Sequence, residues 1–89
     1  MNTAFPLGQT VITSNAQRKL NPKDVVRCLE RHAACDWGEV NKEDKGLNDQ
    51  ALQDGDRLLS AYTDRNDIKF WIITEADRSA TTVLLPEDY

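Results

Sequence analysis

The stretch from Arg57 to Leu85 constrains the fold most, because it contains the densest run of strand-forming residues in the chain. It reads RLLSAYTDRNDIKFWIITEADRSATTVLL, and two polar segments rich in turn formers divide it into three short apolar runs. Three apolar runs joined by short turns are typical of an antiparallel meander. We expect its strands at 57–62, 68–75 and 80–85.

The central run of this stretch predicts a sheet with two apolar faces. Phe70 and Ile72 alternate with Trp71 and Ile73, and successive side chains of a strand point to opposite faces of the sheet. Helices are expected to cover one face. The other face requires the N-terminal segment, Trp37 or a partner to cover it.

One short strand and a well-signalled helix are expected before the meander. Residues 9–13 are rich in β-branched side chains and predict the strand, whereas a helical piece at 16–20 is too short to hold without tertiary support. The helix should span 22–34, because Asn21 can cap it and Pro22 stands at the first helical position, where its missing N–H is harmless.

A second, less apolar helix should span 42–53 and end at Gly55. The chain is thus expected to be a single globular α+β domain over residues 1–89. Its order is an N-terminal β segment, two helices and then a three-stranded antiparallel β-meander, whose edge the first strand could join. The core residues expected from these patterns are Val25, Leu29, Leu47, Leu52, Leu59, Phe70, Ile72 and Val83.

The composition is that of a folded protein, with 39% hydrophobic and 29% charged residues. No window approaches the ~20 apolar residues of a membrane span, and the N-terminus lacks the basic start and apolar run of a secretion signal. Cys28 and Cys35 would lie about 10 Å apart on the first helix, beyond the ~7 Å limit for a disulfide. We therefore expect a cytoplasmic protein with reduced thiols.

Charge is distributed unevenly along the sequence. The 15 acidic and 11 basic side chains give a net charge of −4, which disfavours a general nucleic-acid binder because phosphate contacts require basic groups. Five basic and two acidic residues lie between Arg18 and Arg31, whereas two basic and seven acidic residues lie between Asp36 and Asp56. The molecule is therefore expected to be electrically polar.

Short segments spread over nearly the whole chain form a pattern: FPLGQ at 5–9, RH at 31–32, DWG at 36–38, LLSAY at 58–62, WIITEADRS at 71–79 and LLPE at 84–87. This pattern resembles that of small plasmid-related proteins, a family carried by bacterial plasmids, integrative elements and their hosts. The resemblance implies a bacterial, cytosolic protein associated with mobile elements. It implies no activity, cofactor or catalytic residue. The chain departs from the family pattern at Ala34-Cys35, where small residues including Gly are usual.

Cys28, His32 and Cys35 carry the kinds of ligand atom that zinc prefers, at positions i, i+4 and i+7 of the first helix. Adjacent turns of one helix cannot close a tetrahedron without a fourth ligand from elsewhere. Thiols buried beside an amphipathic face explain the pattern better. We expect neither a metal nor another cofactor.

An enzymatic hypothesis starts from His32 and Asp36, because a carboxylate four residues away could orient the imidazole as a general base. A helix C-terminus also attracts a histidine through its dipole, which is a structural explanation. In the turn at 75–79, Asp77 could lock its own hairpin, or Asp77 and Arg78 could present a binding group. A small enzyme would require all four side chains to converge in a cleft.

The acidic stretch is either a solvated helix face or a surface that imitates the phosphate rows of nucleic acid. The binding residues expected from this stretch and from the turn are Asp36, Trp37, Glu39, Glu43, Asp44, Asp49, Asp77 and Arg78. The leading hypothesis is a non-enzymatic binding protein of mobile elements whose partner is a protein, such as a basic nucleic-acid-processing protein of a host defence or restriction system. The alternative is the small enzyme.

Overall fold

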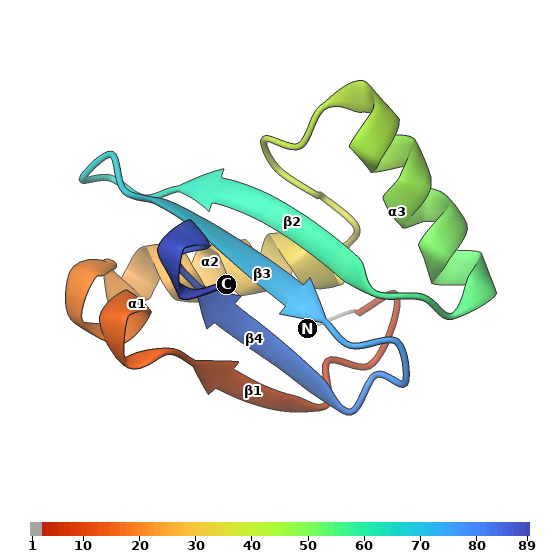
Figure 1. Cartoon of the computed structure of the whole chain (residues 1–89), viewed down its shortest axis with the longest axis horizontal. Helices are drawn as coiled ribbons and strands as arrows, with labels where there is room; N and C mark the ends of the chain where they lie inside the picture. Colours follow the sequence, from red (N-terminus) through yellow and green to blue (C-terminus); the bar gives the residue numbers. More distant parts are fainter. Residues whose placement is uncertain (1–2) are drawn as a thin grey trace.

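A four-stranded mixed sheet forms the centre of the structure (Figure 1). The computed structural model describes residues 3–89. Its strands are β1 (Gln9–Ile12), β2 (Leu58–Thr63), β3 (Lys69–Thr74) and β4 (Ala80–Leu84), in the order β1-β4-β3-β2. The last three are antiparallel neighbours, whereas β1 lies parallel to β4. The α+β class is confirmed, and the three-stranded meander is one part of a larger sheet.

Three helices and a short 3-10 turn surround the sheet. They are α1 (Ser14–Lys19), α2 (Pro22–Ala33), α3 (Lys42–Asp54) and η1 (Pro86–Asp88). In the view of Figure 1, α2 lies behind the sheet, α1 lies at its left end, α3 lies beside β2 and η1 lies in front. The prediction of two helices was one short, because α1 receives from the fold the support that its length cannot provide.

Local signals decide where the helices begin and end. The hydroxyl of Thr13 accepts a hydrogen bond from the backbone N–H of Ala16 and caps α1. The side chain of Asn21 accepts from the N–H of Lys23 at 3.0 Å and caps α2, as predicted. Gly55 ends α3 with a φ of 77°, in the left-handed region that glycine enters freely.

Two clusters of buried side chains form the core. The larger cluster contains Ala16, Leu20, Val25, Cys28, Tyr62, Phe70, Ile72, Val83 and Leu85. The smaller cluster contains Phe5, Trp37, Ala51 and Leu58. Among the predicted core residues, Val25, Phe70, Ile72 and Val83 are buried, and Leu29, Leu52 and Leu59 are half-buried.

Leu47 is not a core residue, and its prediction as one was wrong, because its side chain is 61% exposed. The buried residues of α3 are Asn48 and Ala51. A helix turns by about 100° per residue, so the rotation that directs Asn48 toward β2 carries Leu47 to the side. A polar residue, rather than the neighbouring leucine, therefore sets the orientation of α3.

The outer edge of β2 is covered by the chain itself. The side-chain amide of Asn48 donates to the backbone C=O of Leu59 at 2.6 Å and accepts from the N–H of Leu59 at 3.1 Å. Beside it, the N–H of Ala61 donates to the C=O of Trp37 at 3.1 Å, and its C=O accepts from the N–H of Glu39 at 2.7 Å. These contacts pair backbone groups that an edge strand otherwise leaves open.

Gly38 makes this coverage possible. Its φ is 75°, and a Cβ at this position would lie 2.1 Å from the carbonyl oxygen of Ala61. A side chain would therefore push the segment off the strand.

The opposite edge of the sheet is uncovered in the described part of the chain. The N–H groups of Gln9 and Thr13 donate to the β4 side of the sheet, so the backbone groups of the alternate residues Thr10 and Ile12 point away from it. Val11 is 42% exposed. The β2 edge of the sheet is therefore covered by other parts of the chain, whereas the β1 edge is open.

The sheet face opposite α2 is covered in part by the end of the chain. The ring of Tyr89 meets that of Trp71 edge to face, with centroids 5.8 Å apart. Arg57 donates from Nη1 to the Tyr89 hydroxyl at 3.1 Å. The C-terminal turn therefore covers part of this sheet face. Trp37, which was considered for this role, instead packs against Phe5 in the smaller cluster.

Replacing Phe70 by alanine should lower the free energy of unfolding by about 3–5 kcal/mol, because its fully buried ring would leave a cavity. Val26→Ala is the control, since Val26 is exposed on α2 and its truncation should change stability by no more than ~0.5 kcal/mol. Urea unfolding of both variants measures the difference. Equal urea midpoints for the two variants would show that the sheet face that carries Phe70 is not part of the core.

Replacing Asn48 by alanine should lower the free energy of unfolding by about 1–3 kcal/mol, because the N–H and C=O of Leu59 would both lose their partner. Gln50→Ala, at an exposed position of the same helix, should have little effect. Hydrogen exchange at the amide of Leu59 provides a local readout. Unchanged protection of this amide in the Asn48 variant would contradict the role given to Asn48.

Candidate functional site

A groove of about 530 Å³ runs between α2 and the turn that joins β2 to β3. Its lining residues are Asp24, Arg27, Cys28, Arg31, Thr63, Asp64 and Arg65. Three guanidinium groups thus lie around one concave surface, together with two carboxyl groups and a thiol. None of these residues was predicted to bind a ligand, and Cys28 was considered only as a zinc ligand.

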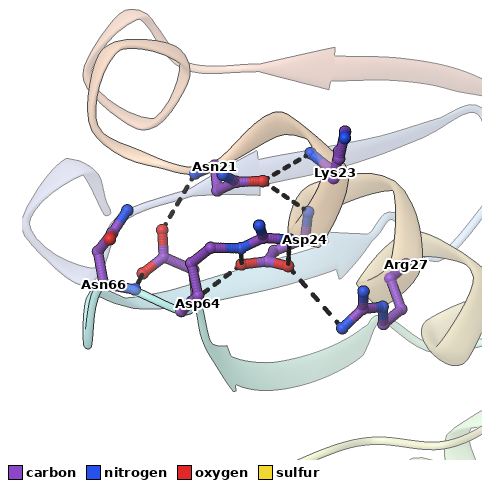
Figure 2. Close-up of polar contacts among 7 residues, drawn as sticks. Asn21, Lys23, Asp24, Arg27, Asp64 and Asn66 are labelled. Atoms are coloured by element: carbon purple, nitrogen blue, oxygen red, sulfur yellow. Dashed lines mark hydrogen bonds and ion pairs between the residues drawn. The ribbon is translucent and has the colours of Figure 1, made fainter.

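Asp24 joins the first turn of α2 to the β2–β3 turn. Its carboxylate accepts from the backbone N–H of Arg65 at 2.9 Å, from its Nε at 3.0 Å and from its Nη2 at 2.9 Å. Arg27 lies on the other side of Asp24, at 3.9 Å (Figure 2). The hydrogen bonds from Arg65 lower the pKa of Asp24 to about 2. Asp24 is therefore ionised at neutral pH.

Asp64 builds the β2–β3 turn and ties it to the start of α2. Its carboxylate accepts from the backbone N–H groups of Asn21 at 3.0 Å, Asn66 at 2.9 Å and Ile68 at 3.0 Å. Figure 2 shows Asp64 between Asn21 and Asn66. Both carboxyl groups of the groove thus have structural partners within the protein.

Arg31 and Cys28 complete the α2 side of the groove. Arg31 donates to Asp36 from Nε at 2.8 Å and from Nη2 at 3.3 Å, and its guanidinium lies over the ring of Tyr62, 4.9 Å from the centroid. Burial raises the pKa of the Cys28 thiol, an effect that Arg31 opposes only in part. The thiol is protonated at neutral pH, which does not favour a nucleophilic role.

His32 is fully buried and both of its ring nitrogens have protein partners. Nδ1 meets the hydroxyl of Ser60, and Nε2 lies 2.8 Å from the hydroxyl of Thr74. The Thr74 hydroxyl lies 2.8 Å from that of Thr81, which donates to the C=O of Leu7 at 2.7 Å. The network therefore links α2 to three strands and the N-terminal segment.

The direction of these hydrogen bonds follows from their last member. A carbonyl can only accept, so Thr81 donates to Leu7, Thr74 donates to Thr81, and Nε2–H of His32 donates to Thr74. Nδ1 must then accept from Ser60. Protonation of His32 would break this order, and burial together with Arg78 lowers its pKa to about 4.

The four side chains considered for an enzyme do not form one open site, although His32 and Arg78 both lie against the ring of Phe5. Asp36 is held by Arg31 at the end of α2, and His32 is closed off from solvent. Asp77 accepts from the N–H of Ser79 at 3.0 Å, as expected of a hairpin lock. Of these four side chains, none lines the groove.

Arg78 supports the β3–β4 turn from within. Its Nη1 donates to the C=O of Asp56 at 2.6 Å and to the C=O of Glu75 at 3.1 Å, and its guanidinium lies over the ring of Phe5. Its backbone has a φ of 61°. These contacts give Arg78 a structural role, connecting the turn to the end of α3.

The residues of the expected acidic surface are divided between core and surface. Trp37 is 1% exposed, so it cannot contact a partner, and its Nε1 donates to Asp49 at 3.0 Å. Glu39 accepts from the hydroxyl of Thr63 at 2.9 Å. Glu43 and Asp44 are exposed in the first turn of α3. A tryptophan between polar residues resembles a surface anchor in sequence, but here it fills the smaller core cluster.

Among residues 3–89, no three His, Cys, Asp or Glu side chains are grouped so as to hold a metal ion. No helix in the same range is long and apolar enough to cross a membrane. No family model, curated protein or solved structure matches the chain. The resemblance to plasmid-related proteins remains an expectation from the sequence.

The free energy of unfolding should fall by about 3 kcal/mol between pH 7 and pH 4 because of His32. Its pKa is about 4 in the folded protein and 6.5 when unperturbed, so the unfolded chain binds more protons between these values. The stability is complete above pH 6.5 and is lost as the pH falls toward 4. The chain contains a single histidine, so NMR titration of its ring protons gives this pKa directly.

The control for this prediction is a His32→Asn variant, which cannot titrate in this window. The carboxyl groups whose pKa is lowered, such as Asp24 and Asp36, affect stability only below about pH 4.5. Urea unfolding of the variant should therefore be nearly independent of pH between 4.5 and 6.5. The role given to His32 is wrong if the free energy of unfolding depends on pH equally in the variant and in the parent protein between pH 4.5 and pH 6.5.

Proposed function

We propose that this chain is a non-enzymatic accessory protein of bacterial mobile elements, which binds a basic protein partner in the cytoplasm through the acidic surface of α3. The observation that carries the proposal is the way α3 is held. Asn48 attaches the helix to β2 with its amide, and Asp49 attaches it to Trp37. Glu43, Asp44 and Asp54 are exposed in the same helix.

The charge around α3 supports a basic partner. Residues 36–56 carry seven acidic and two basic side chains, and the two lysines lie in the first half of α3. Acidic groups spaced along a fixed helix attract a positively charged surface over a distance comparable to the Debye length of ~8–10 Å. A nucleic-acid-processing protein of a host defence or restriction system presents such a surface, where it normally holds phosphates.

The enzyme hypothesis receives less support from the same contacts. Each of its four side chains has a partner within the protein, and the imidazole of His32 is closed off from any substrate. A general base must reach the proton that it removes. We therefore favour binding over catalysis.

Neutralising the exposed acids of α3 should slow association with the partner. The test variant is Glu43→Gln, Asp44→Asn, Asp54→Asn, which spares the anchoring residues Asn48 and Asp49. The partner is first isolated from a bacterial lysate on the immobilised full chain and identified. We expect the association rate to fall about tenfold or more at low salt and to depend less on salt concentration, because exposed charges act mainly on the encounter.

A matched control removes the same charge elsewhere, through Glu30→Gln, Asp67→Asn and Glu87→Gln, all at exposed positions outside α3. This control should keep most of the parent's association rate. A short DNA duplex should compete with the chain if the partner uses its nucleic-acid groove. Equal rates for both triple variants, or binding unaffected by DNA, would argue against this surface or against this class of partner.

A further inference from the structure

We propose that the groove along α2 binds a small molecule that carries a phosphoryl group. Its volume of about 530 Å³ lies within the ~300–1,000 Å³ usual for small-molecule sites. Glu43, Asp44 and Asp54 of the acidic surface do not line it. The inference therefore stands apart from the proposed function, and either can fail alone.

The carboxyl groups of the groove are occupied, whereas its guanidinium groups are not fully used. Asp24 accepts three hydrogen bonds from Arg65, and Asp64 accepts three from backbone N–H groups. Each guanidinium carries five N–H donors. The lining can therefore offer donors to a ligand while its own negative charges remain engaged.

Arg31 and Arg65 are bound in the same manner. Each uses Nε and Nη2 to hold a carboxylate, Asp36 for Arg31 and Asp24 for Arg65. Among the hydrogen bonds within residues 3–89, none is donated by Nη1 of Arg31 or Arg65, although the Arg31 guanidinium also lies near the thiol of Cys28. A guanidinium fixed along one edge loses less rotamer freedom when its other edge binds a ligand.

Arg27 supplies the group that is least engaged. Its guanidinium approaches Asp24 only to 3.9 Å, too far for a hydrogen bond, and its side chain is 68% exposed. Arg27 and Arg31 are four residues apart on α2, so they lie on the same side of the helix. Arg65 faces them across the groove from the β2–β3 turn.

The number of guanidinium groups favours a phosphoryl group over a carboxylate. A carboxylate has two oxygens and one charge, which one arginine satisfies in a bidentate pair. A phosphoryl group has three strong acceptor oxygens and a charge of about −1.5 to −2 at pH 7. Three arginines around one groove match the greater number of acceptors, and the lining keeps a net charge of +1 when Asp24 and Asp64 are counted.

The test is a titration of the full chain with small anions. The Nε–H signals of its arginines in ¹⁵N NMR spectra report the binding. The probes are pyrophosphate and AMP, with acetate and sulfate at matched ionic strength. We expect saturable shifts for pyrophosphate and AMP, confined to Arg27, Arg31 and Arg65. Shifts of similar size with acetate and sulfate, or shifts that do not saturate, would show nonspecific ion binding and overturn the proposal.

Arg27→Gln is the decisive variant, because Arg27 makes no hydrogen bond that the fold requires. It should weaken the binding of pyrophosphate at least fivefold. Arg18→Gln, which removes one positive charge from α1, is the control and should change the affinity less than twofold. If both variants weaken the binding of pyrophosphate equally, the binding reflects general electrostatic attraction, and the proposed site is wrong. An oligonucleotide that binds much more tightly than AMP would overturn the small-molecule assignment.

Discussion

The imidazole of His32 holds α2 against the sheet, and much of the structure depends on its being neutral. Through Ser60 it contacts β2, through Thr74 it contacts β3, and through Thr81 the same chain of hydrogen bonds reaches β4 and the segment before β1. A buried polar group is tolerated only when its partners are present. The helix, the sheet and the N-terminal segment must therefore all be in place for this chain of hydrogen bonds to be complete.

The second polar connection lies at the other end of α2. Asp24 and Asp64 join the first turn of the helix and the residue that caps it to the β2–β3 turn. The helix is thus fixed at its C-terminal end by neutral hydrogen bonds and at its N-terminal end by ionic ones.

The elements that could be predicted from the sequence are those that local chemistry determines. Asn21, Pro22 and Gly55 mark helix ends by their own conformational preferences, and the alternation around Phe70 identifies a strand. The first strand was expected to be able to join an edge of the meander, and it does so at β4. Its parallel direction was not predicted, because this pairing joins residues about 70 positions apart. The contact of Asp24 with Arg65, 41 positions apart, was not predicted either.

The same limit applies to the sites. The excess of basic residues between Arg18 and Arg31 did signal a basic region, but its partner Arg65 lies in a turn with no distinctive pattern. Leu47, which was expected in the core, is exposed, and Trp37, which was expected to cover a sheet face or to bind a partner, is buried. Burial depends on how a segment is rotated, and here that rotation is set by Asn48 and Gly38.

The covered edge of β2 has a consequence for how the protein can misassemble. Fibres grow by strand addition when each chain offers two open edges, one to accept a neighbour and one to be accepted. In residues 3–89, the outward backbone groups of Leu59 and Ala61 in β2 are already paired with Asn48, Trp37 and Glu39, so β1 is the more open edge. If two chains pair through their β1 strands, each uses its open edge. Assembly by strand addition would then stop at a dimer.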